Sequence, residues 1–553
     1  MRNCKFIFCL FFFNAITTIN VIAQDFSVNG LYYNVVSLEK LTCEVTHAAT
    51  KYSGDIIIPE NVTYNGRNFK IVGIGEEAFY HCKEMISIHL PSTLEYIGKD
   101  AFLYCDKLKE VHIGDIYKWC NISFANAWAA PLYDNHYAVA YTKGEKIESL
   151  DLKKITKISD YAFCGMRTLK DISLPRIESI GVMSFAVCIK LTSLNLPSCL
   201  QVIGKDAFCQ CTGLKTVNIP PLVEKLEGNA FGGEVIYGWP HMDSVIIEES
   251  DRSINLNSSF GSNSPHEKII IRRNFVGSSG QFKSWVIGNK VTSIPPRLFS
   301  SYTRVGGTID FPEYEYLQPY KITDIVFEDG PDPLKIGEAL YFSNYRTTRI
   351  YNQLSTGGLD FHNLYLGRPL VESDRIEEYK SKVSSSMLKP PYYYSIFYDV
   401  DIQRLTIGNY LKNEDIEYLN FPRYQGLKYL RIGKNITSVP NMTDNSNLDT
   451  LVVLNRNPPL AVGFANKTYL NCKLYVPKGC KSAYETANVW KNFWNIIELE
   501  ETDETSGIEK YKADAHAENN SIYSVIGYKT NTLQRGVNVI RKNDGTVKKV
   551  IVK

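Results

Sequence analysis

The sequence predicts an α/β repeat solenoid in which short strands build a curved sheet, followed by a small C-terminal β-module. Three observations support this fold class. A block of residues recurs every 22 or 23 positions, apolar residues hold fixed places after each block, and an acid-rich segment separates the last repeats from further strand-like stretches. Of the 553 residues, 44% are hydrophobic and 22% are charged, which is typical of a globular chain and excludes a disordered one.

The first 23 residues are typical of an export signal. Arg2 and Lys5 precede an apolar run at 6–13, and the small residue Ala23 ends the segment. A membrane anchor is the alternative, but Asn14 interrupts the run, which is too short to span a bilayer. No later stretch is long and apolar enough for a transmembrane span. We therefore expect an exported protein that is extracellular or associated with the cell surface or outer membrane.

The repeats are clearest over residues 74–232. The block Ile-Gly-x-x-Ala-Phe stands at 74–79 and returns, with substitutions, at 97–102, 158–163, 180–185, 203–208 and 226–231. Apolar residues follow the block phenylalanine after three, six, nine and eleven positions. Positions nine and eleven point to one face of a short strand, whereas the block suits a helical turn on the opposite wall. One unit cannot bury both sets, but stacked units bury them in one core.

The unit I-G-x-x-A-F-x-x-C-x-x-L-x-x-I-x-L-P has the length and the L-x-x-L-x-L spacing of leucine-rich repeats. It resembles the BspA-like leucine-rich repeats of secreted and surface proteins of Bacteroidetes. The strand-like stretch 54–59 and the turn at 64–66 look like that family's opening segment, and we expect residues 24–73 to form an N-terminal β cap. The resemblance implies adhesion, by protein binding, to host matrix or to other cells.

Residues 233–426 keep only fragments of the repeat. Diverged repeats are the interpretation that we favour, and inserted loops that carry binding determinants are the alternative. Residues 427–497 return to the pattern as final repeats and a C-terminal cap. In this cap one helical face is predicted to carry Cys480, Ala483, Tyr484, Ala487, Trp490 and Trp494.

The end of the chain is predicted to be a separate module. Residues 498–520 are acid-rich and are interpreted as a linker. Residues 521–553 are expected to form strands near 522–525 and 537–541 and a hairpin through the turn at 543–545. This tail resembles the sorting tails of Bacteroidetes surface proteins. A small β-module without a sorting role is the equal alternative.

The sequence contains no recognisable catalytic, cofactor or metal motif, so we expect no enzyme activity, no cofactor and no metal. An unrecognised active site within 232–426 is the alternative. The 61 basic and 59 acidic residues nearly cancel, which gives no case for a nucleic-acid partner. One inward column of cysteines is expected to hold buried free thiols, namely Cys82, Cys105, Cys188 and Cys211. Whether Cys472 and Cys480 form a disulfide is left open.

Two groups of residues are candidates for a binding surface. The repeat register predicts one exposed row on the concave face, formed by His89, His112, Ser173, Asn195 and Asn218. The two histidines are too few for an ordinary metal site, so solvated side chains are the favoured interpretation. The second group is aromatic and contains Tyr392, Tyr393, Tyr394 and Tyr398, for which core packing is the alternative role.

The expected partner is a protein ligand on a host or bacterial surface. A role as a surface glycan-binding accessory protein, which would use the exposed tyrosines, is the alternative.

Overall fold

The computed structural model describes residues 24–133, 138–233, 240–257, 259–261, 266–277, 280–294, 322–335, 362–371, 402–417, 419, 421 and 424–500, and the strand residues within 521–552. The predicted export signal therefore lies outside the described residues. The chain divides into two compact units. Unit 1 contains Met1–Pro197, Val202–Gly213 and Gly233–Gly238, and unit 2 contains Ser198–Gln201, Leu214–Gly232 and Trp239–Lys553.

Unit 1 begins with a β cap. A seven-stranded sheet contains β1 (Phe26–Val28), β2 (Leu31–Ser37), β3 (Thr42–Thr46), β5 (Asn61–Tyr64), β6 (Arg67–Ile74), β8 (Tyr96–Ile97) and β10 (Ser123–Phe124). The hairpins β1–β2, β2–β3 and β5–β6 are antiparallel, and from β3 onward the path through β6, β8 and β10 is parallel. The cap therefore leads directly into the parallel repeat strands.

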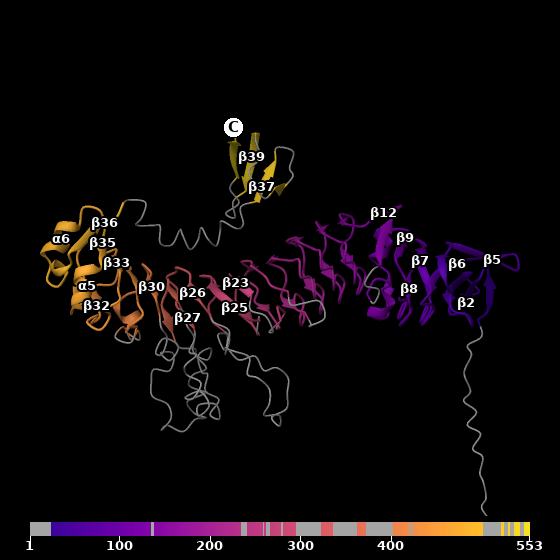
Figure 1. The fold of residues 1–553 in the computed structure, drawn as a ribbon, viewed down its shortest axis with the longest axis horizontal. Helices are drawn as coiled ribbons and strands as arrows, with labels where there is room; N and C mark the ends of the chain where they lie inside the picture. Colours follow the sequence, from indigo (N-terminus) through magenta and orange to yellow (C-terminus); the bar gives the residue numbers. More distant parts are fainter. Residues whose placement is uncertain are drawn as a thin grey trace, which may run out of the picture. The chain divides into compact units, whose positions relative to one another are not determined.

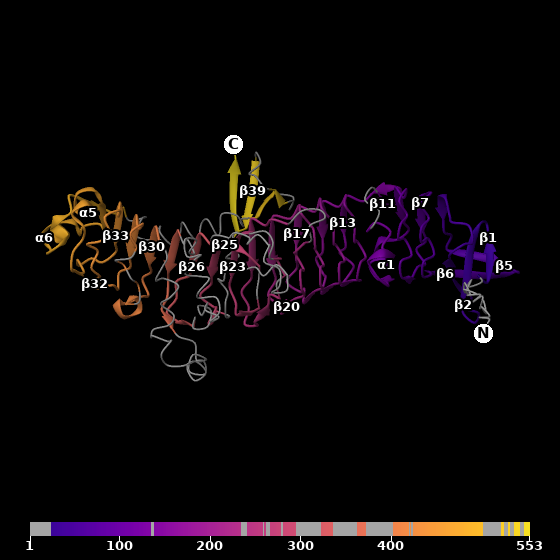
Figure 2. The ribbon, with the colours of Figure 1, turned by 60° about the horizontal axis from the view of Figure 1, so that its bottom comes forward.

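A second series of strands lies along the opposite wall of unit 1. One sheet has the order β12-β11-β9-β7-β4 and contains β4 (Gly54–Ile57), β7 (Met85–Leu90), β9 (Glu110–Ile113), β11 (Val139–Thr142) and β12 (Glu145–Lys146). The next contains β13 (Ser149–Asp151), β15 (Asp171–Ser173) and β17 (Ser193–Asn195), and short strands accompany it at β14 (Lys157–Ile158), β16 (Ser179–Ile180) and β18 (Val202–Ile203). Figure 1 shows β7 and β9 side by side with β8 across from them, and Figure 2 shows β7, β11, β13 and β17 in succession.

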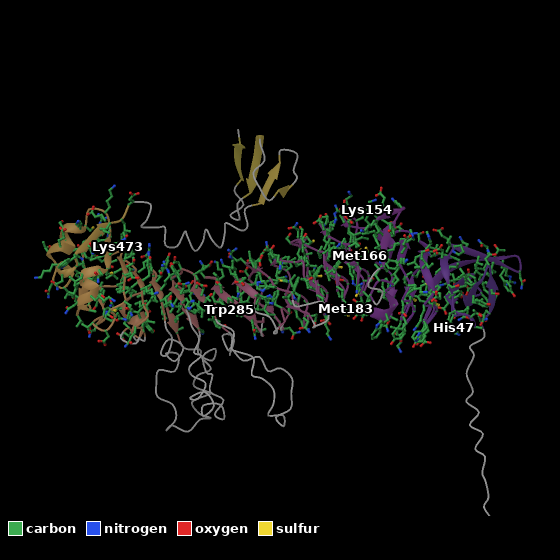
Figure 3. The ribbon with its side chains drawn as sticks, in the orientation of Figure 1. His47, Lys154, Met166, Met183, Trp285 and Lys473 are labelled. Carbon is green, nitrogen blue, oxygen red and sulfur yellow. The ribbon has the colours of Figure 1, made fainter. Side chains whose placement is uncertain are left out.

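The predicted inward positions form the core of unit 1. Ile88 and Val111, nine residues after their block phenylalanines, are fully buried. The phenylalanines stack from unit to unit, with ring centroids 5.3 Å apart for Phe79 and Phe102. The predicted cysteine column is buried, and its members are free thiols. Met166, labelled in Figure 3, fills the same place in its own repeat.

The helical turn that we expected in each block is wrong. Residues 76–81 form hydrogen-bonded turns, in which Glu77 and His81 have φ values of 54° and 58°. These left-handed residues, and Phe79 between them, donate their backbone N–H groups to carbonyls of the next repeat, at 2.9 Å for Phe79 to Ala101. The turns leave these N–H groups free of partners within their own repeat. The groups can therefore form hydrogen bonds that join one repeat to the next. No α-helix occurs between residues 74 and 113.

The block glycine is needed for this stacking. A Cβ atom on Gly98 would lie 2.4 Å from the backbone nitrogen of Glu76 in the preceding turn. Backbone cannot move aside as a flexible side chain can, so only glycine permits this approach. The repeat motif therefore requires glycine at this position because neighbouring repeats approach each other closely there.

Irregular structure interrupts unit 1 where the sequence loses its period. The segment after β9 contains α1 (Ile116–Trp119) and the 3-10 helix η1 (Ala127–Ala129). The side chain of Asp115 caps α1 by accepting hydrogen bonds from the backbone of Tyr117 and Lys118. The indole nitrogen of Trp119 donates to the carbonyl of Ala162 at 2.6 Å, which ties this segment to the following repeat.

Unit 2 is built on an eleven-stranded parallel sheet. In order it contains β19 (Thr216–Ile219), β21 (Ser244–Ile247), β23 (His266–Ile271), β25 (Phe282–Ile287), β26 (Asp324–Phe327), β28 (Asn363–Leu366), β30 (Arg404–Ile407), β31 (Tyr429–Ile432), β33 (Thr450–Val453), β35 (Lys473–Val476) and β36 (Asn495–Glu498). Short strands lie between these, including β20 (Lys225–Leu226), β22 (Ile254–Asn255), β24 (Phe275–Val276), β27 (Leu334–Lys335), β29 (Leu370–Val371), β32 (Ser438–Val439) and β34 (Leu460–Ala461). The described parts of residues 233–426 thus contribute parallel strands that pair in register, from β21 to β30.

The C-terminal cap differs in part from its prediction. It contains α5 (Asn466–Asn471), α6 (Lys481–Thr486) and the 3-10 helix η8 (Trp490–Asn492). Tyr484 and Trp490 are buried as expected, but Trp494 is 77% exposed. The single helical face fails because α6 ends at Thr486 and the chain continues in extended conformation at Ala487. Cys472 and Cys480 are both free, buried thiols.

Four strands lie within residues 521–552: β37 (Ser521–Ser524), β38 (Lys529–Thr530), β39 (Gly536–Arg541) and β40 (Val547–Val552). They pair antiparallel in the order β38-β37-β39-β40. Residues 501–520 of the predicted linker lie outside the described residues. A sorting role for this tail stays a prediction.

Candidate binding surface

Three rings stack on the outward face of unit 1. His89 on β7 pairs directly with His112 on β9, and their rings lie parallel with centroids 4.0 Å apart and an interplanar angle of 1°. Tyr141 on β11 pairs with His112, and its ring lies 5.0 Å further on. Neighbouring strands are ~4.8 Å apart, so planar side chains at equivalent outward positions meet face to face. We call His89, His112 and Tyr141 the ring ladder.

A second row of outward residues accompanies the ring ladder. Asp55 on β4, Ser87 on β7 and Glu110 on β9 are paired in register, and we call them the acidic row. The hydroxyl of Ser87 donates to a carboxylate oxygen of Asp55 at 2.7 Å. A carboxylate oxygen of Glu110 lies 3.1 Å from Nε2 of His112, so the two rows are joined by a hydrogen bond.

The two rows differ in charge at neutral pH. Burial, and after it the neighbouring His112 ring, lowers the pKa of His89, which favours the uncharged imidazole. The neighbouring row carries the acidic side chains of Asp55 and Glu110. The surface therefore presents flat rings beside acidic side chains. Such a surface favours a partner with aromatic or apolar side chains next to basic ones.

The remaining residues of the predicted row lie in other sheets. Ser173 on β15 pairs with Asn195 on β17, and both side chains are exposed, as expected from the register. Asp151 on β13 extends this pair in the other direction. Asn218 is exposed on β19, where the sheet of unit 2 begins. The predicted single row is thus divided over three sheets, the first of which ends with the antiparallel pair β11 and β12.

The outward face of unit 2 is chemically different. Asn218 pairs with Ile246, and from there the outward row is apolar and buried, with Ile246, Ile270, Val286, Val326 and Tyr365 forming a hydrophobic cluster of its own. The hydroxyl of Tyr365 donates to Asp329 at 2.8 Å, and burial raises the pKa of this phenol. Sequence reasoning missed this cluster. Its signal is the unbroken apolar runs at 245–247 and 269–271, which indicate strands covered on both faces.

Sequence reasoning also missed Tyr141 and the acidic row. Tyr141 lies in the segment where the repeat period fails, so no register connected it to His112. The β-prone residues Val-Ala-Tyr-Thr at 139–142 were the available signal for a further strand. The predicted aromatic group, Tyr392, Tyr393, Tyr394 and Tyr398, lies outside the described residues.

Within the described part of the chain, no cluster of three or more His, Cys, Asp or Glu side chains has the arrangement of a metal site. Over the same residues, no helix combines the length and the apolar character that crossing a membrane requires.

A leucine-rich repeat protein is built of stacked units. Each unit contributes a parallel strand, a hydrogen-bonded turn and a second short strand, as the units of this chain do. Residues 54–128 and 136–264 match the family model of the BspA type leucine rich repeat region, in six copies. The resemblance to BspA-type leucine-rich repeats seen in the sequence is thus confirmed over these residues.

The structure is similar to several solved structures at low sequence identity. A leucine-rich repeat protein from Bacteroides ovatus ATCC 8483 is 17% identical, with a TM-score of 0.33 over 78% of this chain and 94% of that chain. A leucine rich cell surface protein from Faecalibacterium prausnitzii A2-165 is 14% identical, with a TM-score of 0.30 over 87% of this chain and 97% of that chain. The T. pallidum leucine rich repeat protein is 17% identical, with a TM-score of 0.18 over 48% and 90% of the two chains. No curated protein matches the chain significantly.

Proposed function

We propose that the protein is an exported, cell-surface binding protein without enzyme activity, whose solenoid sheet attaches it to another protein. The ring ladder and the acidic row of unit 1 form the contact surface. The observation that carries this proposal is the stack of His89, His112 and Tyr141, three half-buried rings on neighbouring strands.

The proposed contact surface is preorganised. Side chains on adjacent strands are held at fixed spacing by the backbone, so little conformational entropy is lost when a partner binds. Aromatic rings provide much contact area for few rotatable bonds. The hydrogen bond between His112 and Glu110 fixes one ring further. The surface is therefore suited to recognition of a protein surface.

The experiment is a binding screen of the chain from residue 24 onward. Purified protein is tested against a panel of host extracellular-matrix proteins, whole bacterial cells and a glycan array. We expect saturable binding to a protein partner at micromolar concentration or tighter, and at least tenfold weaker binding for Tyr141→Ala, since hot-spot aromatic residues cost about 1.4 kcal/mol or more when truncated. Absence of any protein partner at micromolar concentration would count against the proposal.

The panel also separates the alternative function. Binding confined to the glycan array would replace protein recognition by glycan recognition. Binding to a protein that Tyr141→Ala leaves unchanged would move the contact surface away from the ring ladder. A correctly folded control is Lys99→Ala, since Lys99 is an exposed side chain of the turn wall and not of the sheet.

A further inference from the structure

Strand β4 is the terminal strand of its sheet. Among the described residues it pairs with β7 alone. The backbone N–H of Gly54 donates to Glu84 at 2.9 Å, and that of Ile58 donates to His89 at 3.1 Å. Main-chain groups of alternate residues in a strand point to opposite edges. Asp55 and Ile57 therefore direct their N–H and C=O groups away from β7, toward the free edge of the sheet.

The free edge opens into a hollow. A cavity of about 920 Å³ is lined by β4, by the loop 50–53, by the turn between β1 and β2, and by β5. Tyr32 and Lys51 are among the side chains that line it, together with Asp55 and Ile57 themselves. Natural sheet edges are ordinarily covered or blunted, because unpaired main-chain groups attract other strands. Here the space beside the edge is vacant among the described residues.

Both outward rows of the sheet end at this edge. Asp55 is the last member of the acidic row, next to Ser87, and Ile57 stands next to His89 at the end of the ring ladder. Ile57 is 66% exposed, which leaves an apolar side chain uncovered beside the hollow. An added strand would continue both rows, because residues two apart on it would point to the same outward face as Asp55 and Ile57.

We propose that the free edge of β4 binds an extended segment of a partner protein by β-strand addition, with a basic side chain beside Asp55 and an apolar or aromatic side chain beside Ile57. The two side chains are two residues apart in the bound segment. Main-chain hydrogen bonds to Asp55 and Ile57 supply the attachment, and the two side chains supply the specificity. The inference rests on the proposed function, because it names the kind of partner segment that the same face takes.

Charge supports this choice of partner. Asp55 accepts a hydrogen bond from the neutral hydroxyl of Ser87. Among the described Lys and Arg side chains, none forms a salt bridge with Asp55. A basic residue on an added strand would stand about 5 Å away in the register position opposite Asp55. A four-residue strand buries far less than the ~1,600 Å² of a standard interface, so we expect transient binding when the segment acts alone.

The test uses a fluorescent eight-residue peptide, Thr-Val-Lys-Val-Tyr-Val-Thr-Thr, as the probe. A matched control peptide has Lys and Tyr on adjacent positions, so that they point to opposite faces. We expect saturable binding of the probe and at least tenfold weaker binding of the control. Addition of the probe should also slow amide hydrogen exchange in residues 54–58, where the new main-chain bonds form.

Substitutions in β4 decide between strand addition and mere adsorption. Ile57→Pro removes the outward N–H while leaving the bonds to β7 in place, since those come from alternate residues. We expect this variant to lose probe binding at least tenfold. Asp55→Lys should bind the probe at least fivefold more weakly, and it keeps the proposal testable if the proline variant does not fold. Ile86→Ala, which removes an exposed side chain from β7, should bind as the parent chain does.

Two outcomes would overturn the inference. One is equal binding of the probe to the parent chain and to both β4 variants, and the other is no binding of the probe at millimolar concentration. Neither outcome contradicts the proposed function if a protein partner still binds and its binding still depends on the ring ladder. Conversely, loss of every protein partner in the screen, with the probe still bound at β4, would contradict the proposed function alone.

Discussion

The guanidinium of Arg368 donates a hydrogen bond of 3.0 Å to the carbonyl oxygen of Gly288, although the two residues lie 80 positions apart in the chain. A second nitrogen donates to Asn289 at 3.0 Å. Arg273 does the same with Pro220, at 2.9 Å. Both arginines are fully buried, and each reaches from the residues after one sheet strand to the end of the strand two places earlier. These side chains hold unit 2 together where the repeat motif has faded.

Arg368→Met is expected to destabilise the protein by about 2 kcal/mol, because it leaves the buried carbonyl of Gly288 and the partly buried carbonyl of Asn289 without donors. Burial lowers the pKa of Arg368 to about 10, so the guanidinium is still charged at neutral pH and its hydrogen bonds are charge-assisted. Thermal unfolding by calorimetry measures the effect. The control is Arg404→Met, since Arg404 is exposed and stacks on Tyr429. Equal melting temperatures for the two variants would contradict the assigned role.

Gly98→Ala is expected to cost about 1–3 kcal/mol, because the added Cβ meets the backbone of the preceding turn. Gly228→Ala is the matched control, since its nearest atoms are 3.9 Å from the added Cβ. We expect the control to change stability by no more than about 1 kcal/mol. The comparison is made by thermal unfolding. A neutral Gly98→Ala would show that the turns do not depend on close backbone approach.

Trp490→Ala is expected to destabilise the C-terminal cap by about 3–5 kcal/mol. The side chain is buried, and its indole nitrogen donates to the carbonyl of Pro459 at 2.7 Å. Trp494→Ala should change stability by about 0.5 kcal/mol or less, because that side chain is 77% exposed. The rate of limited proteolysis within residues 466–498 measures the local stability of the cap directly. Similar protease sensitivity of the two variants would refute the placement of the tryptophans.

His266 is expected to make stability depend on pH. Its Nδ1 accepts from the backbone of Met242 at 3.1 Å, so the proton sits on Nε2, which donates to Phe260 at 2.6 Å. Burial lowers the pKa of His266, and the nearby His241 acts in the same direction. The unfolded chain therefore binds a proton at higher pH than the folded chain, so the stability is complete above pH ~6.5 and is lost as the pH falls through the lower folded-state pKa.

His266→Gln tests this dependence. The variant lacks the titrating ring, so its melting temperature should fall less than that of the parent between pH 7.5 and pH 5. Glu267, the nearest carboxylate in sequence, is engaged by Lys283 at 2.6 Å and is unchanged in both chains. An equal fall in the melting temperatures of the parent and the variant across this pH range would show that His266 does not cause the pH dependence.

The repeat period predicted a large part of unit 1. It placed Ile88 and the cysteine column in the core, and it placed His89 directly beside His112, because a constant period converts sequence distance into rung position. The turns could not be predicted in this way. The left-handed conformations of Glu77 and His81 depend on hydrogen bonds to the next repeat, which no pattern within one unit reveals.

Other features depend on where the period stops. Tyr141 joins the ring ladder through a strand that follows an irregular segment, so its rung could not be counted from His112. Trp494 was assigned to a helical face because the cap helix was expected to be longer than α6. Arg273 and Arg368 follow sheet strands, but their acceptors lie two strands back, at a distance along the chain that the sequence does not mark.

The most direct test of the central claim is the affinity of the partner from the binding screen for His89→Ala/His112→Ala, measured against Ser173→Ala/Asn195→Ala as the control. Both double variants remove outward side chains from paired strands of unit 1. If the ring ladder forms the contact surface, the histidine variant binds at least tenfold more weakly and the control binds within about twofold of the parent chain. Equal affinity of the parent and the histidine variant, with both folded, would contradict recognition through the ring ladder.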